Sequence, residues 1–130
     1  MAISRETSVH DSMIESVMEY MRAQGFFNIT ANLPGIPLPE KIYKPESGEY
    51  FIPDLIADRK GEGYIFDVET EDTLDDIQTA KKWKLFSAYA EKNNKVFHIV
   101  VPSGMLVKVD RMLSEHKLTA VVHQINFNQE

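Results

Sequence analysis

The stretch FIPDLIADRKGEGYIFDVET, residues 51–70, decides the fold that the sequence predicts. It is typical of two short strands, at residues 50–58 and 64–70, joined by a tight turn. The turn, residues 59–63, is rich in residues that tolerate a positive φ. The sequence therefore predicts a β-hairpin at the centre of the fold.

Three carboxylates fall on this hairpin. Because side chains alternate between the two faces of a strand, Asp67 and Glu69 should project from one face together with Ile65. Pro53-Asp54 puts a third acid on the partner strand. Like charges this close repel one another unless a cation or a shared proton compensates them, and hard divalent cations take oxygen ligands. The other face carries apolar side chains, those of Tyr64, Phe66 and Val68.

Length and composition indicate one domain, residues 1–130, with 43% hydrophobic residues and no cysteine. The absence of cysteine rules out disulfides and fits a cytoplasmic location. No stretch approaches the length of a membrane span, so we expect no membrane association. The net charge of −6 argues against strong non-specific binding of nucleic acid, but not against local contact with DNA.

The rest of the chain predicts an α/β (α+β) fold with the order α-β-β-β-α-β-α-β. A hairpin followed by helical crossovers gives a mixed central sheet with helices on both faces. The Pro-rich segment between the first two strands can be neither a central strand nor a helix. It could extend a hairpin, reach over a substrate or form a dimer contact. Outside the hairpin, the expected elements are helices at 5–24, 71–93 and 105–116 and strands at 26–33, 95–101 and 119–127.

The helix at 71–93 follows the acids directly, and Asp72 or Thr73 is its expected cap. Its expected apolar face consists of Leu74, Ile77, Leu85 and Ala88, with Gln78 and Lys81 inside that face. Lys81 either extends to solvent or faces the carboxylates. Trp83 and Phe86 fall on the far side, where they are covered or offer an aromatic patch to a partner. In the first helix, Tyr20 falls on the expected apolar stripe.

The order of elements, with Pro53-Asp54 and Asp67-Val68-Glu69 on consecutive strands, resembles the PD-(D/E)XK nuclease superfamily, which has the restriction endonuclease-like fold. Glu69 stands where the lysine of the motif belongs. Some members of the superfamily carry the lysine on the following helix, where Lys81 or Lys82 is the candidate. Gln78 is similar to a glutamine often found there. For the acid of the first helix, Glu15 is near the expected spacing, Glu6 fits the helical wheel better, and His10 also lies on the apolar stripe.

The resemblance implies metal-dependent hydrolysis of phosphodiester bonds in DNA. Asp54, Asp67 and the carbonyl of Val68 would bind Mg²⁺ or Mn²⁺, and Glu69 would be a general base or a further ligand. Lys81 would stabilise charge in the transition state, and Gln78 and Lys82 would contact the substrate. Such an enzyme could act as a homodimer, because a chain of 130 residues offers little surface for a DNA duplex.

Two alternatives stay open. A catalytically degenerate relative would act as an interaction module or subunit, which the acidic balance and the missing motif lysine favour. Trp83 and Phe86 would then be candidates for the partner face. In a different αβ fold, Asp67 and Glu69 would line a solvated sheet face, and Asp54 would pair with Arg59 or Lys60. His10 would be a hydrogen-bonded, partly buried side chain. Neither alternative requires a bound metal.

Overall fold

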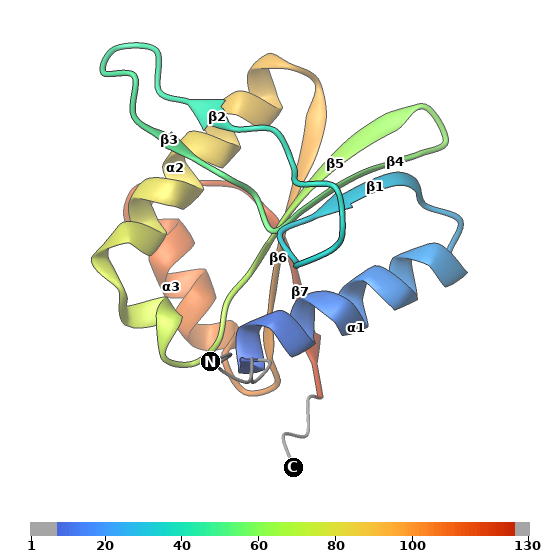
Figure 1. Ribbon diagram of the computed structural model, residues 1–130. Coiled ribbons are helices and arrows are strands. Elements are labelled where there is room, and N and C mark those ends of the chain that lie inside the picture. The colour runs from blue at the N-terminus through green and yellow to red at the C-terminus, as the bar shows by residue number, and fades with distance from the viewer. Residues whose placement is uncertain (1–7, 127–130) are drawn as a thin grey trace, which may run out of the picture.

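The computed structural model describes residues 8–126, and these residues form a five-stranded mixed sheet between helices (Figure 1). The strand order is β1-β4-β5-β6-β7, and a separate two-stranded ribbon is made by β2 and β3. Helix α1 lies on one side of the sheet, and α2 and α3 lie on the other. The elements are α1 (Val9–Ala23), β1 (Phe27–Ala31), β2 (Ile42–Tyr43), β3 (Tyr50–Phe51), β4 (Leu55–Arg59), β5 (Glu62–Val68), a 3-10 turn (Thr73–Asp75), α2 (Ile77–Lys92), β6 (Lys95–Pro102), α3 (Leu106–His116) and β7 (Val121–Ile125).

The central hairpin is formed by β4 and β5, which pair antiparallel from Leu55 opposite Phe66 to Arg59 opposite Glu62. Its turn is shorter than predicted and consists of Lys60 and Gly61, both with positive φ, at 52° and 81°. Two such residues match the right-handed twist of the strands they join. The strand predicted at residues 50–58 is divided into β3 and β4, because Pro53 between them has no N–H to donate to a ladder.

The sheet changes direction at β5. β1, β4 and β5 pair antiparallel, whereas β5, β6 and β7 pair parallel. Parallel neighbours need a crossover, and α2 and α3 supply the two crossovers. The sequence prediction of a mixed sheet with helices on both faces is confirmed. The structure adds the β2–β3 ribbon to the predicted order.

The two faces of the central hairpin belong to two separate cores, as alternation predicts. Tyr64, Phe66 and Val68 pack towards α1, where Met13, Ile14 and Met21 are buried. On the opposite face, Ile65 packs among buried side chains of β6, α2 and α3. Asp67 lies two residues after Ile65, so it points towards α2.

The predicted apolar face of α2 is wrong in part: Leu74 is buried and Leu85 packs against the core, but the start and the rotation of the helix differ from the prediction. The helix begins after Asp76, whose carboxylate accepts a hydrogen bond from the Gln78 N–H at 2.8 Å, so Asp72 and Thr73 do not cap it. Trp83 and Phe86 are completely buried, whereas Ile77 is 77% exposed. Ile77 is the first residue of the helix, and Leu74 belongs to the preceding 3-10 turn, so neither defines the helix face. The buried side of α2 consists of Thr79, Trp83, Phe86 and Ala90.

This result removes the predicted aromatic patch on α2, because Trp83 and Phe86 are core residues. A smaller correction concerns α1, where Tyr20 is 64% exposed although the predicted stripe includes it. The helix begins at Val9, with the Ser8 hydroxyl accepting from the Asp11 N–H at 3.0 Å. Residues 5–7 of the predicted helix lie outside the described residues.

The Pro-rich segment leads into the β2–β3 ribbon, which lies over α2 (Figure 1). Ile42 pairs with Phe51 across the ribbon and is buried against the α2 core. Extension of a hairpin, one of the three alternatives for this segment, is therefore confirmed. Within residues 8–126, no helix is both long and apolar enough to cross a membrane.

Candidate functional site

Asp54 fastens the end of β5 to the chain that enters β4. Its Oδ2 accepts a hydrogen bond of 2.8 Å from the Val68 N–H, and its own N–H donates to the Phe66 carbonyl at 3.1 Å. The side chain is buried. The prediction that Asp54 lies beside the acid-bearing end of β5 is thus confirmed, whereas pairing with Arg59 or Lys60 is not what the structure shows.

His10 reaches this point from the first turns of α1. Its Nε2 lies 2.8 Å from the Val68 carbonyl oxygen and 3.3 Å from Asp54 Oδ2. Because a carbonyl can only accept, Nε2 carries the proton in this contact. Of the three first-helix candidates, His10 is the one at the acids. Glu15 is exposed, and Glu6 lies outside the described residues.

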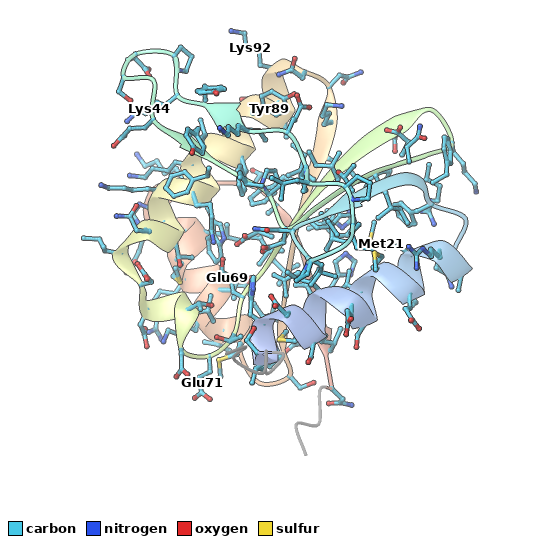
Figure 2. All side chains as sticks on the ribbon, viewed as in Figure 1. Met21, Lys44, Glu69, Glu71, Tyr89 and Lys92 are labelled. Carbon is cyan, nitrogen blue, oxygen red and sulfur yellow. The ribbon has the colours of Figure 1, made fainter. Side chains whose placement is uncertain are left out.

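Asp67 and Glu69 are held by two consecutive residues of α2. The Trp83 Nε1–H donates to Asp67 Oδ2 at 2.8 Å, and Lys82 Nζ is 3.2 Å from Asp67 Oδ1. Lys82 Nζ also lies 2.7 Å from Glu69 Oε2. Asp67 is 0% exposed and Glu69 is 1% exposed. Figure 2 shows Glu69 between α1 and α2.

Lys82 therefore takes the position that the sequence prediction gave to Lys81. The burial of Trp83 and Phe86 fixes the rotation of α2, and this rotation turns Lys82 towards the acids and Lys81 towards solvent. Gln78 is also exposed, and both Gln78 and Lys81 line a groove beneath the β2–β3 ribbon. Neither contacts the acid cluster, by which we mean Asp54, Asp67 and Glu69.

The acid cluster distributes its charge unequally. Burial, together with the charge and hydrogen bond of Asp67, raises the pKa of Glu69 to about 9, although the charge and hydrogen bond of Lys82 act to lower it. Burial alone would also raise the pKa of Asp67. The hydrogen bond from Glu69, the charge of Lys82 and the bonds of Asp54 and Trp83 outweigh that effect and lower the pKa of Asp67. Asp67 is the ionised member of the pair, and Glu69 retains its proton at neutral pH.

Asp54 and His10 form a second pair, in which the pKa of each group depends on the other. Burial raises the pKa of Asp54 to about 6, against the hydrogen bond and charge of His10. The Asp54 hydrogen bond raises the pKa of His10 in turn. Burial acts to lower the pKa of Lys82, but the charge of Asp67 and the contact with Glu69 raise it, so the ammonium stays charged.

Threonines order the loop that leads from Glu69 into α2. The Thr73 hydroxyl accepts a 2.7 Å hydrogen bond from the Thr70 N–H, and the Thr79 hydroxyl donates to the Thr73 carbonyl at 2.6 Å. The Glu69 N–H donates to the Val100 carbonyl at 2.9 Å, which continues the pairing of β5 with β6. These bonds set the spacing between Glu69 and Lys82.

The donor chemistry of the cluster fits a hard divalent cation. Within residues 8–126, Asp67 Oδ1 and Glu69 Oε2 are buried and receive no well-directed hydrogen bond, although Lys82 Nζ is near both. Among the same residues, no three Asp, Glu or His side chains are grouped so as to hold a metal by themselves. Mg²⁺ commonly binds one or two carboxylates and takes its other ligands from water and substrate. Asp54, Asp67 and the Val68 carbonyl would be such a partial set.

A pair of histidines lies at the other side of the sheet. His98 Nδ1 and His123 Nε2 are 2.6 Å apart, and the two rings stack with centroids separated by 4.8 Å. Parallel pairing of β6 with β7 brings them together. Burial and the nearby charges of His123 and Arg59 lower the pKa of His98 to about 4, and burial lowers the pKa of His123. Both rings are therefore neutral at pH 7.

Sequence reasoning missed Trp83 as a contact of Asp67. A tryptophan following a lysine on the helix after the acids was the available signal, because a buried indole N–H needs an acceptor.

The chain was also compared with known proteins. No protein-family model matches it, and no curated protein is significantly similar to it.

Proposed function

We propose that this chain is a metal-dependent nuclease with a restriction endonuclease-like fold, which hydrolyses phosphodiester bonds in DNA. The observation that carries the proposal is the pairing of the buried Asp67 and Glu69 with the ammonium of Lys82, next to the buried Asp54, which binds the N–H of the intervening Val68. Three buried acids are costly to keep unless a cation compensates them. A cluster built only for stability would be better replaced by apolar side chains.

The arrangement of elements around the cluster supports the same proposal. Asp67 lies on β5, Asp54 immediately precedes β4 and Glu69 immediately follows β5. A helix packs against each face of the sheet, and the next strand pairs parallel with β5. The resemblance to the PD-(D/E)XK pattern uses the same two strands and the helix that follows them. Lys82 on α2 takes the role of the motif lysine, whose usual place is occupied by Glu69.

Each residue then has a chemical task. Asp54, Asp67 and the Val68 carbonyl would hold Mg²⁺ or Mn²⁺. When bound, the cation would polarise the scissile phosphate and acidify a water molecule. Glu69, which carries a proton at neutral pH without a cation, would become a general base or a further oxygen ligand after a bound cation displaces that proton. Lys82 places a positive charge beside the acids, where it can stabilise charge that develops on the phosphate. His10 orients Asp54 and the Val68 carbonyl through the contacts at 3.3 and 2.8 Å.

A cleavage assay on single-stranded, duplex and branched DNA tests this function. Cleavage should require Mg²⁺ or Mn²⁺, and Asp54→Asn, Asp67→Asn and Lys82→Met should each reduce it by about a hundredfold or more, as the loss of charge-stabilising groups does elsewhere. Asp110→Asn is the matched control, because Asp110 is an exposed acid on α3. Metal-independent cleavage, or equal activity of all variants, would contradict the proposal.

The burial of the cluster favours a second candidate function. Asp67 and Glu69 are almost inaccessible, and Lys82 already supplies a positive charge between them. In this alternative the chain is a non-catalytic interaction module that retains a nuclease-like site. The two functions differ in one property, since only the nuclease needs a divalent cation at Asp54 and Asp67.

A further inference from the structure

A groove of about 710 Å³ separates the β2–β3 ribbon from the outer side of α2. We call it the hairpin groove. Figure 2 shows Lys44 on the ribbon, on the same side of the molecule as Tyr89 of α2. The side chains that line it and matter here are those of Lys44, Tyr50, Gln78, Lys81 and Lys84. The acid cluster does not line this groove, so it is a separate feature of the surface.

The α2 wall of the groove is basic in an acidic protein. Two of the four lysines of α2 line the groove and the single acid of the helix, Glu91, does not, whereas the whole chain has a net charge of −6. Lys81 and Lys84 face the groove, and Lys44 faces it from the ribbon. Glu46 and Glu49 line its ribbon end, so the positive charge is concentrated along α2. A positive wall of this kind attracts a polyanion.

The ribbon adds exposed aromatic rings to these charges. Tyr43 and Tyr50 are cross-strand partners and share one face of the ribbon. They are 54% and 46% exposed, with ring centroids 5.5 Å apart. Lys41 Nζ lies 4.6 Å from the centre of the Tyr50 ring. Exposed rings beside lysines are the combination on which unpaired bases stack while their phosphates are neutralised. Bases in a duplex are already stacked and cannot use it.

The hairpin groove adjoins the acid cluster through both of its walls. On the ribbon side, Phe51 is three residues before Asp54, which is at most about 10 Å of extended chain. On the helix side, Gln78 is one turn before Lys82, so the two side chains start roughly 6 Å apart. A strand in the groove would therefore lie within a few nucleotides of the acids.

We propose that the hairpin groove binds a single-stranded segment of nucleic acid, with its phosphates on Lys81 and Lys84 and a base stacked on Tyr50. This assigns a substrate class to the nuclease site, and in that respect it rests on the proposed function. The binding itself requires neither metal nor cleavage. The ribbon is thus the element that guides an unpaired strand towards Asp54 and Asp67.

Fluorescence anisotropy in EDTA tests the groove without any catalysis. The probes are a labelled oligothymidylate, an oligouridylate of equal length and a duplex of equal length. The oligothymidylate or oligouridylate should bind more tightly than the duplex. Lys81→Ala combined with Lys84→Ala should reduce the slope of log affinity against log salt by about 1.4, because each phosphate contact on a single strand contributes about 0.7.

Aromatic stacking has its own matched pair of variants. Tyr50→Leu should weaken single-strand binding by about tenfold or more, whereas Tyr50→Phe, which keeps the ring, should not. Arg111→Ala removes an exposed cation from α3 and controls for net charge. Absence of binding to every oligonucleotide, or binding that the lysine and tyrosine variants leave unchanged, would overturn the proposal.

Mn²⁺ binding distinguishes a failure of the groove assignment from a failure of the proposed nuclease function. Calorimetry of the Lys81, Lys84 and Tyr50 variants should give wild-type Mn²⁺ affinity, because none of these residues contacts the acid cluster. If single-strand binding fails while Mn²⁺ binding at Asp67 persists, the groove assignment is wrong and the proposed nuclease stands. If Mn²⁺ binding fails while the oligonucleotide binds in the groove, the nuclease is wrong and the binding site stands.

Discussion

The acid cluster and the histidine pair are both groups of like titratable side chains brought together by the sheet. They differ in how the repulsion between like charges is reduced. Asp67 and Glu69 gather Lys82 and Trp83 around them, and one proton remains on Glu69. His98 and His123 lose their charge instead, since burial and Arg59 disfavour the protonated form. Only the acid cluster recruits counter-charges, which is the arrangement expected of a site built to hold charge.

The largest effect should come from removing the counter-charge. Lys82→Met leaves the buried, ionised Asp67 without its cation, and the free energy of unfolding should fall by about 3 kcal/mol or more. Urea unfolding at neutral pH measures this change. If stability is unchanged, Lys82 does not hold the acids and the contrast with the histidine pair fails.

The next-largest loss of stability should come from removing the indole N–H of Trp83. Trp83→Phe keeps an aromatic ring in the core and removes the N–H that binds Asp67, so it should cost about 1–3 kcal/mol of unfolding free energy. The same substitution in an Asp67→Ala background, which has no side-chain acceptor for the indole N–H, supplies the control. A double-mutant cycle with no coupling between the two residues would show that the cost is packing alone.

The histidine pair should be visible as a pH dependence of stability. The pKa of His98 is about 4 in the folded protein and 6.5 in an unfolded chain, so the unfolded state binds more protons between these values. Stability from this group is complete above pH 6.5 and is lost as the pH falls towards 4, by about 1–2 kcal/mol after allowance for its partial exposure.

His98→Phe retains an aromatic ring against Phe66 and removes the titration. The difference in unfolding free energy between wild type and this variant should therefore shrink or reverse in favour of the variant as the pH falls below 6.5. A difference that stays constant from pH 6.5 to pH 4 would show that the pair does not lose its charge on folding.

The smallest effect should come from the lysine next to Lys82. Lys81 is exposed, so Lys81→Ala should change the free energy of unfolding by no more than about 0.5 kcal/mol. Compared in the same urea experiment, the two neighbouring lysines report the inner and the outer side of α2. Equal costs would mean that the rotation of α2 differs from the one described here.

The hairpin and its two faces were predictable because their signals are local. The alternation of Tyr64, Phe66 and Val68 with Ile65 and Asp67 needs only the period of a strand. The choice between Lys81 and Lys82 was not predictable. Neighbouring residues on a helix point about 100° apart around its axis, and the tertiary packing of Trp83 sets the rotation of α2.

Contacts between distant segments set the rest of the site. Trp83 reaches Asp67 across 16 residues, and His10 reaches Val68 across 58. The hydrophobic periodicity within one helix or strand cannot predict such a long-range contact. The sequence could place acids on adjacent strands, but the partners that hold them depend on how α1 and α2 pack against the sheet.

Calorimetric titration of Mn²⁺ into the wild type, Asp67→Asn and the exposed-acid control Asp110→Asn is the most direct test of the central claim, that the acid cluster is a divalent-cation site. Wild type and Asp110→Asn should bind Mn²⁺ saturably, and Asp67→Asn should not bind it. A wild-type protein that binds no Mn²⁺ at millimolar concentration, or a folded Asp67→Asn that binds it equally well, would contradict the claim.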